Sequence, residues 1–178
     1  MQVHRLFEIP EHQLNHGAKR ESIATKENGA WKAYSTQELI DLSDRLARGL
    51  MALGIGPGDR VAIASGNRSE WCLLDQAILR AGAINVPIYP TSSVEDYSYV
   101  LQHSEAKVCF CSNAEILAKA LVAQKASPPL QHLFTFDHLA GQRHWTEVAP
   151  LSERVPVKTR CVGAFTCPCP NCSNARTE

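Results

Sequence analysis

A stripe of leucines is the clearest pattern in the chain and predicts its first strong helix. Five leucines between residues 39 and 53 recur at intervals of three or four positions, which places them on one buried helix face. Ser35 stands before the stripe, and Glu38 three residues later completes a capping box. Gly54 follows the stripe and favours the left-handed conformation that commonly ends a helix.

After residue 54 the pattern changes to short apolar runs separated by helical segments. The runs that predict buried strands are residues 60–65, 83–89, 107–111 and 131–136. The helices between them are predicted to begin at a cap, which is Asn67, then Ser92 or Ser93, then Asn113. This alternation predicts an α/β fold with a parallel sheet and crossover helices.

Pro87 stands inside the second of these runs. Proline has no N–H group and cannot donate to a neighbouring strand. We therefore expect the strand that contains Pro87 to lie at an edge of the sheet or at a bulge.

The N-terminal part of the chain carries weaker patterns. Residues 1–20 specify no clear element. The pair Asn28 and Gly29 lies between two short β-prone runs within residues 22–34, and this arrangement predicts a hairpin.

The C-terminal part loses its periodicity. The segment from Trp145 to Pro150 is the last for which we expect an ordered contact, and residues 152–178 show neither a helical nor a strand period. We therefore predict an α/β domain over residues 1–150 and an irregular, cysteine-rich tail over residues 151–178.

Composition and charge narrow the class of protein. The chain has 178 residues, 44% of them hydrophobic and 20% charged, which is typical of one globular domain. Its 18 basic and 18 acidic residues cancel, so bulk charge gives no indication of a nucleic-acid partner. We see no targeting segment and no apolar run long enough to cross a membrane, so we expect a cytoplasmic protein with reduced thiols.

Four of the seven cysteines gather near the C-terminus, at positions 161, 167, 169 and 172. Four thiolates could hold zinc, but the C-x-C-x-x-C spacing is not that of a zinc ribbon. We therefore predict no metal site and keep a small zinc-binding protein as a minor alternative, which the zinc content of the purified protein would test.

No catalytic motif is present in the sequence. The glycines at 54, 56 and 58 follow a helix and open a strand, which is the reverse of a dinucleotide fingerprint. The chain also lacks a G-x-x-x-x-G-K-[ST] phosphate loop and a G-x-S-x-G nucleophile elbow. We predict no catalytic residue.

Ligands of open parallel sheets bind beyond the carboxyl ends of the strands. The residues there that could bind a ligand are Asn67, Arg68, Tyr89 and Thr91. Structural roles explain some of them as well, because Asn67 is a good helix cap and Arg68 could be a solvated flank.

Several blocks over residues 30–112 resemble the adenylate-forming superfamily. The first two blocks are Trp31 with Glu38-Leu39, and Gly58-Asp59-Arg60-Val61-Ala62-Ile63. Two further blocks look like long-chain fatty-acid–CoA ligases, namely Asn67-Arg68-Ser69-Glu70-Trp71 and Ala81-Gly82-Ala83-Ile84-Asn85-Val86-Pro87-Ile88-Tyr89-Pro90-Thr91. The chain thus resembles an N-terminal fragment of an AMP-forming fatty-acid–CoA ligase.

The resemblance implies a parent reaction that activates a fatty acid through an acyl-adenylate to acyl-CoA, with ATP, Mg and CoA. It also implies the first α/β part of a large N-terminal domain. No position matches the family's phosphate loop, its acidic ribose motif or its C-terminal lysine. We therefore expect an inactive chain that binds none of these cofactors.

Three further expectations accompany this one. The alternative to an inactive ligase fragment is a non-catalytic α/β binding or interaction module. A chain without the rest of such an enzyme is also expected to self-associate through exposed apolar surface. The tail beyond residue 155 has the composition of a shifted reading frame, which the other frames of the encoding DNA would test.

Overall fold

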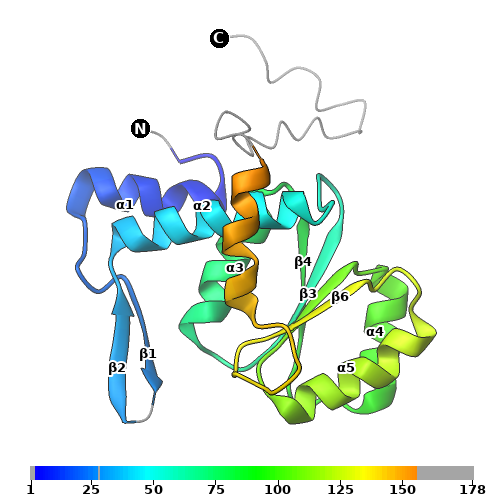
Figure 1. Cartoon of the computed structure of the whole chain (residues 1–178). Helices are drawn as coiled ribbons and strands as arrows, with labels where there is room; N and C mark the ends of the chain where they lie inside the picture. The colour runs from blue at the N-terminus through cyan, green and yellow to red at the C-terminus, as the bar shows by residue number, and fades with distance from the viewer. Residues whose placement is uncertain (1–2, 28, 156–178) are drawn as a thin grey trace.

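A four-stranded parallel sheet forms the centre of the molecule (Figure 1). We describe it from a computed structural model, which covers residues 3–27 and 29–155. The strands are β3 (Arg60–Ala64), β4 (Ile84–Ile88), β5 (Val108–Cys111) and β6 (His132–Thr135). They lie in the order β4-β3-β5-β6, and each neighbouring pair is parallel. The predicted α/β fold class is confirmed.

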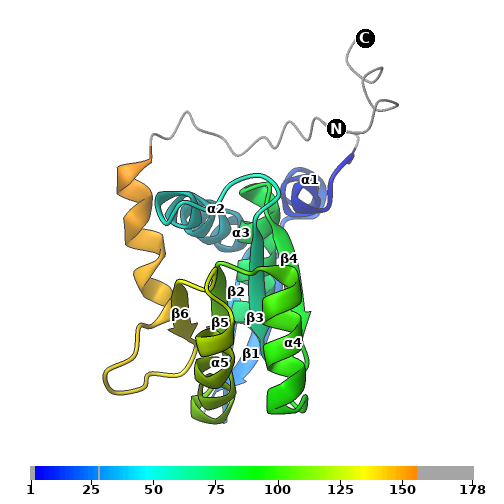
Figure 2. The same cartoon turned by 90° about the vertical axis from the view of Figure 1, so that its right-hand side faces the viewer.

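Helices cover both faces of this sheet (Figure 2). The four long ones are α2 (Thr36–Ala52), α3 (Ser69–Arg80), α4 (Val94–Ser104) and α5 (Ala114–Ala126). Alternate strand residues face opposite sides, so Val61 and Ile63 pack with α2 and α3, whereas Ala62 and Ala64 pack with α4 and α5. The burial of both faces explains why the strands read as continuous apolar runs.

Most of the predicted helix ends are confirmed. Ser35 and Ser93 each accept a hydrogen bond from the backbone N–H three residues later, in capping boxes with Glu38 and Asp96. Asn113 caps α5 through the N–H of Ile116. These caps are local, so the sequence alone identifies them.

The predicted cap at Asn67 is wrong. The cap residue of α3 is Arg68, whose backbone is extended and whose side chain makes no capping bond. Arg68 instead reaches acidic partners, and the N–H of Ser69 is satisfied by the side-chain oxygen of Thr25 at 3.1 Å. A distant hydroxyl thus takes the place of a local cap.

Pro87 lies on an edge strand, as predicted, because β4 pairs only with β3 among the described strands. The N–H of Ile84 donates to the carbonyl of Asp59, so in this parallel register residues 84, 86 and 88 direct their backbone groups at β3. Pro87 therefore faces the free edge, where its missing N–H removes nothing from the sheet.

The N-terminal residues are more ordered than predicted. They form α1 (Ile9–Gly17), preceded by the 3-10 turn η1 (Leu6–Glu8). Arg80 of α3 pairs with Glu11, and Gln13 accepts hydrogen bonds from the hydroxyls of Ser22 and Thr36. Contacts from distant parts of the chain thus hold a helix whose own pattern is weak.

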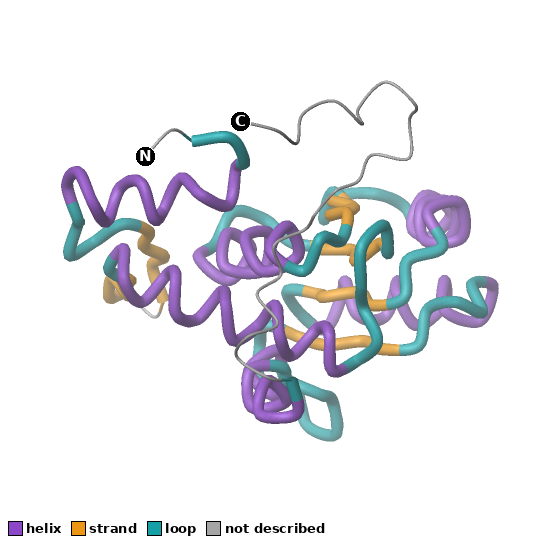
Figure 3. The backbone as a smooth tube through the Cα atoms, turned by 90° about the horizontal axis from the view of Figure 1, so that it is seen from above, coloured by secondary structure: helices purple, strands orange, loops and turns teal. Residues whose placement is uncertain are grey.

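The predicted hairpin is present as β1 (Ile23–Glu27) and β2 (Ala30–Tyr34), an antiparallel sheet of two strands. Gly29 has the positive φ of a tight turn, at +82°, while Asn28 lies outside the described residues. Figure 3 shows the hairpin and α1 at one end of the molecule, apart from the four-stranded sheet.

The last described segment consists of the 3-10 helices η2 (Trp145–Glu147) and η3 (Ala149–Arg154). Trp145 is buried, as expected of an ordered contact. The expectation of no regular structure from residue 152 is wrong for the first residues, because η3 packs along α2 and runs to Arg154. Cys161, Cys167, Cys169 and Cys172, and the proposed frame change beyond residue 155, lie outside the described residues.

Candidate functional site

A cleft with a volume of about 880 Å³ lies beside the sheet. One wall is the β1–β2 hairpin. The other consists of the β3–α3 loop and the segment that follows β6, with residues 136–138 and 144–146. The cleft thus lies beyond the carboxyl ends of β3 and β6, where ligands of open parallel sheets commonly bind.

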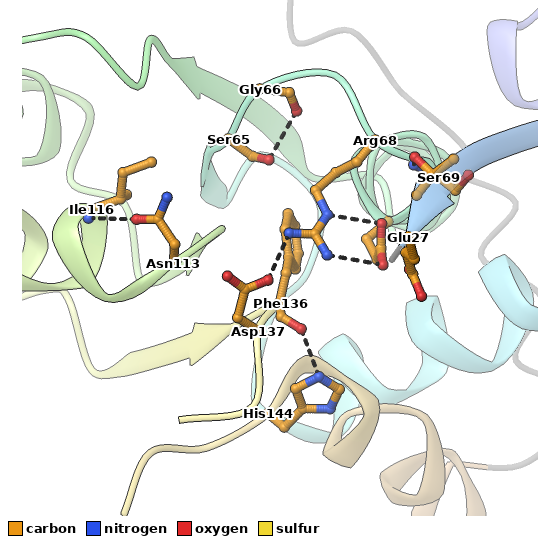
Figure 4. A network of polar contacts seen from close by, with 12 residues as sticks. Glu27, Ser65, Gly66, Arg68, Ser69, Asn113, Ile116, Phe136, Asp137 and His144 are labelled. Carbon is orange, nitrogen blue, oxygen red and sulfur yellow. Dashed lines mark hydrogen bonds and ion pairs between the residues drawn. The ribbon is translucent and has the colours of Figure 1, made fainter. Parts of the chain in front are cut away.

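Arg68 is the central charged side chain of this cleft (Figure 4). Its Nε and Nη2 atoms lie 3.0 and 3.3 Å from the two carboxylate oxygens of Glu70, a bidentate pair. Its Nη1 lies 3.0 Å from Asp137 just after β6, and its guanidinium lies 5.2 Å from the centre of the Phe136 ring. Arg68 thereby joins the start of α3 to the end of β6.

Glu70 is almost fully buried, at 2% exposure. Burial raises the pKa of its carboxyl, but the hydrogen bonds and charge of Arg68 outweigh burial and hold that pKa below its ordinary value. Burial likewise lowers the pKa of Arg68, but its bonds to Glu70 and Asp137 outweigh this and leave the pKa raised. Both groups are therefore charged at neutral pH.

His144 closes the far side of the cleft. Its Nε2 lies 2.8 Å from the carbonyl oxygen of Phe136, to which it donates, and its Nδ1 lies 2.7 Å from the hydroxyl of Thr146. The His138 ring stacks on it at 3.8 Å. Burial, and then the charge of His138, lower the pKa of His144, so its neutral form is favoured.

The four candidate binding residues divide between two places. Asn67 and Arg68 line the cleft, whereas Tyr89 and Thr91 lie in the β4–α4 loop and do not line it. Tyr89 is 81% exposed, and Lys119 of α5 holds this loop by donating to the carbonyls of Pro90 and Ser92. The expectation that Arg68 is a solvated flank is wrong, because two carboxylates engage it.

The side chains of the cleft are arranged for binding and structural support more than for catalysis. The charge of Arg68 is taken up by its two acidic partners, and both ring nitrogens of His144 have partners. The Thr146 hydroxyl lies 2.7 Å from Nδ1 of His144, but the other ring nitrogen donates to a backbone carbonyl and not to a carboxylate that would strengthen the imidazole as a base. No group of three or more potential metal ligands occurs in residues 3–27 and 29–155.

Sequence reasoning missed Glu70, Asp137 and His144 as members of this site. Asp137 follows the last strand directly, so the rule about strand ends could have identified it. Glu70 has the spacing of a capping residue, which concealed its pairing with Arg68. His144 lies in an irregular loop that carries no signal.

Comparison with known proteins identifies the family. A family model described as "AMP-binding enzyme" matches residues 11–162. The long-chain-fatty-acid–CoA ligase FadD15 of Mycobacterium bovis is 45% identical over 95 residues, which are 52% of this chain and 16% of the relative. Fatty acyl-CoA synthetase B of Dictyostelium discoideum is 33% identical over 126 residues, which are 71% of this chain and 18% of the relative.

Solved structures show the same fold. The anthranilate CoA ligase AuaEII, in complex with anthranoyl-AMP, superposes with a TM-score of 0.70 at 19% identity, over 83% of this chain and 27% of that one. The chain spans about a sixth of the length of the FadD15 and synthetase B relatives. No described helix is long and apolar enough to cross a membrane. The match to the family model extends over most of the sequence, and the chain belongs to the AMP-binding enzyme family.

Proposed function

We propose that this chain forms part of the large N-terminal domain of a long-chain fatty-acid–CoA ligase. The parent reaction is the ATP-dependent activation of a fatty acid through an acyl-adenylate to acyl-CoA. The observation that carries the proposal is the 45% identity to a ligase of this class over half of the chain. The CoA ligases among the relatives support the use of ATP, Mg and CoA by the parent enzyme.

The proposed role of the described residues is to support the site of that reaction. Arg68, Glu70 and Asp137 of the cleft satisfy one another, and no residue of the sequence matches the family's phosphate loop. Fatty acid, ATP, Mg and CoA are accordingly bound by other segments of the parent enzyme, and the 178-residue chain alone turns nothing over.

A chimera tests the first part of this proposal. The N-terminal part of Mycobacterium bovis FadD15 that corresponds to residues 11–155 in the shared AMP-binding family model is replaced by those residues, and CoA thioester formation is measured with palmitate, ATP, Mg and CoA. We expect thioester formation that depends on ATP. A folded chimera without activity, compared with FadD15 prepared in parallel, would contradict the assignment and favour a non-catalytic interaction module.

A further inference from the structure

Two histidines lie one turn apart on α1. His12 and His16 are four positions apart within this helix, so their side chains lie on the same face. Their rings are stacked, with the centroids 4.1 Å apart and an angle of 13° between the planes. Helical zinc sites hold their metal with two histidines at this spacing.

The nitrogen atom that a metal ion needs is free on both rings. Nδ1 of His16 lies 2.8 Å from the carbonyl oxygen of His12, which can only accept, so in the neutral ring this nitrogen carries the proton and Nε2 keeps its lone pair. A histidine that binds a metal commonly donates its other ring N–H to a backbone carbonyl in this way. Among the described residues, neither Nε2 of His16 nor either ring nitrogen of His12 has a hydrogen-bond partner.

A second stacked pair of histidines lacks this property. The rings of His138 and His144 lie 3.8 Å apart in the cleft, but both ring nitrogens of His144 have partners, which are the carbonyl of Phe136 and the hydroxyl of Thr146. The stacking of two rings therefore does not identify a metal site by itself. The free nitrogens distinguish the pair on α1.

The opposite side of α1 is fixed to the body of the molecule. Glu11 pairs with Arg80 of α3, and Gln13 accepts a hydrogen bond from the hydroxyl of Thr36. The histidines lie on the side that these contacts leave open, where His16 is exposed and its partner is partly exposed. The two rings are thus held close together before a ligand binds, which lowers the entropy cost of binding.

The chemistry of the two rings selects a class of metal ion. Imidazole nitrogen suits Ni²⁺, Cu²⁺ and Zn²⁺, whereas Mg²⁺ prefers oxygen ligands. Two metal–nitrogen bonds of about 2.1 Å at a tetrahedral angle place the two nitrogen atoms about 3.4 Å apart, which rings with centroids 4.1 Å apart reach by a small rotation. No third His, Cys, Asp or Glu joins the pair in the described part of the chain, so water completes the coordination.

We propose that His12 and His16 form a surface site for a divalent cation of the nickel, copper and zinc group, which clamps one turn of α1. The site does not depend on the proposed ligase function. Helix α1 has nine residues, fewer than the roughly 12 that an isolated helix needs in water, so a metal that requires the helical spacing stabilises it. The pair was not predicted from the sequence, because its spacing has meaning only on a helix and residues 1–20 specify no clear element.

Nickel binding to the 178-residue chain tests the site. The thiols are first alkylated with iodoacetamide, because the cysteines near the C-terminus compete for the metal, and equilibrium dialysis with NiCl2 then measures the dissociation constant. We expect His12→Gln and His16→Gln each to weaken the tightest binding at least about tenfold, because one imidazole alone cannot chelate. His103→Gln is the matched control, because His103 lies on α4 without a second histidine one turn away, and it should change nothing. Equal affinity in the unsubstituted chain and both α1 variants would overturn the proposal.

Hydrogen exchange followed by mass spectrometry tests the clamp. At a free nickel concentration ten times the dissociation constant, the amides of α1 should exchange about tenfold more slowly, while those of β3 and β5 change little. Without nickel, His16→Gln should leave the exchange of α1 unchanged, because glutamine is a good helix former, and with nickel it should abolish the slowing. Nickel bound through both histidines without slower exchange of α1 would contradict the clamp. Slowing that persists in His16→Gln would place the metal elsewhere and overturn the site.

Discussion

Gly49 in α2 lies directly against the backbone of Val148, between η2 and η3. A methyl group at position 49 would overlap the carbonyl oxygen of Val148 and lie 2.8 Å from its carbonyl carbon. The obstacle is backbone, which cannot rotate away as a side chain can. Glycine at this position therefore allows the last described segment to pack against the first helix of the core.

Gly49→Ala should consequently separate η3 from α2. We expect a decrease of about 3 kcal/mol or more in the free energy of unfolding, the range of severe overpacking. Urea denaturation followed by circular dichroism measures it. Gly17→Ala is the matched control, because Gly17 ends α1 with open space around it, and its effect should stay within about 0.5 kcal/mol.

Arg68→Met should destabilise the chain by leaving the buried carboxylate of Glu70 without its cation. Removal of one partner of a buried ion pair costs about 3 kcal/mol. The double variant Arg68→Met with Glu70→Met should recover at least half of that loss, because it leaves no buried charge. A loss in the double variant equal to the sum of the losses in the two single variants would show that the pair does not act as a unit.

Asp137→Asn provides the comparison for this network. Asp137 is half exposed, with 48% of its side chain accessible, and its bond to Arg68 is therefore screened by water. We expect a loss below about 1 kcal/mol by thermal or urea unfolding. A loss as large as that of Arg68→Met would place the main support of Arg68 at β6 instead of α3.

Pro87→Val should preserve the fold and create self-association. Because position 87 faces the free edge of β4, valine adds an outward N–H without disturbing the ladder to β3. Size-exclusion chromatography with light scattering should show dimers that increase with concentration and exceed those of the unsubstituted chain. A strongly destabilised monomer would mean that position 87 faces β3.

Stability should fall as the pH falls from about 7 towards 5. The pKa of His144 in the folded chain lies below its unfolded value of about 6.5, so the unfolded chain takes up protons first. Burial and the charge of Arg143 lower the pKa of His132 in the same direction. His144→Gln should flatten the dependence of melting temperature on pH. An unchanged slope would show that other groups cause this dependence.

The elements set by local chemistry could be predicted from the sequence. The caps at Ser35, Ser93 and Asn113 depend on a residue three positions away, and the strands depend on their own apolar runs. The missing N–H of Pro87 limited its strand to an edge of the sheet or a bulge, and the structure has the edge.

Elements that depend on distant partners could not be predicted. Helix α1 depends on Arg80 and Thr36, and the start of α3 depends on Thr25, 44 positions earlier in the sequence. In the candidate site, Arg68 pairs with Asp137, which lies 69 positions later in the sequence. No periodicity specifies the path of the loop between β6 and η2, so the pairing that organises the cleft was visible only in the structure.

We propose that this chain supports the fold of a fatty-acid–CoA ligase and does not catalyse the reaction by itself. The most direct measurement is CoA thioester formation by the purified 178-residue chain with palmitate, ATP, Mg and CoA, with FadD15 as the positive control. We expect no thioester above the enzyme-free blank. Thioester formation that depends on ATP and scales with the concentration of the chain would contradict the account.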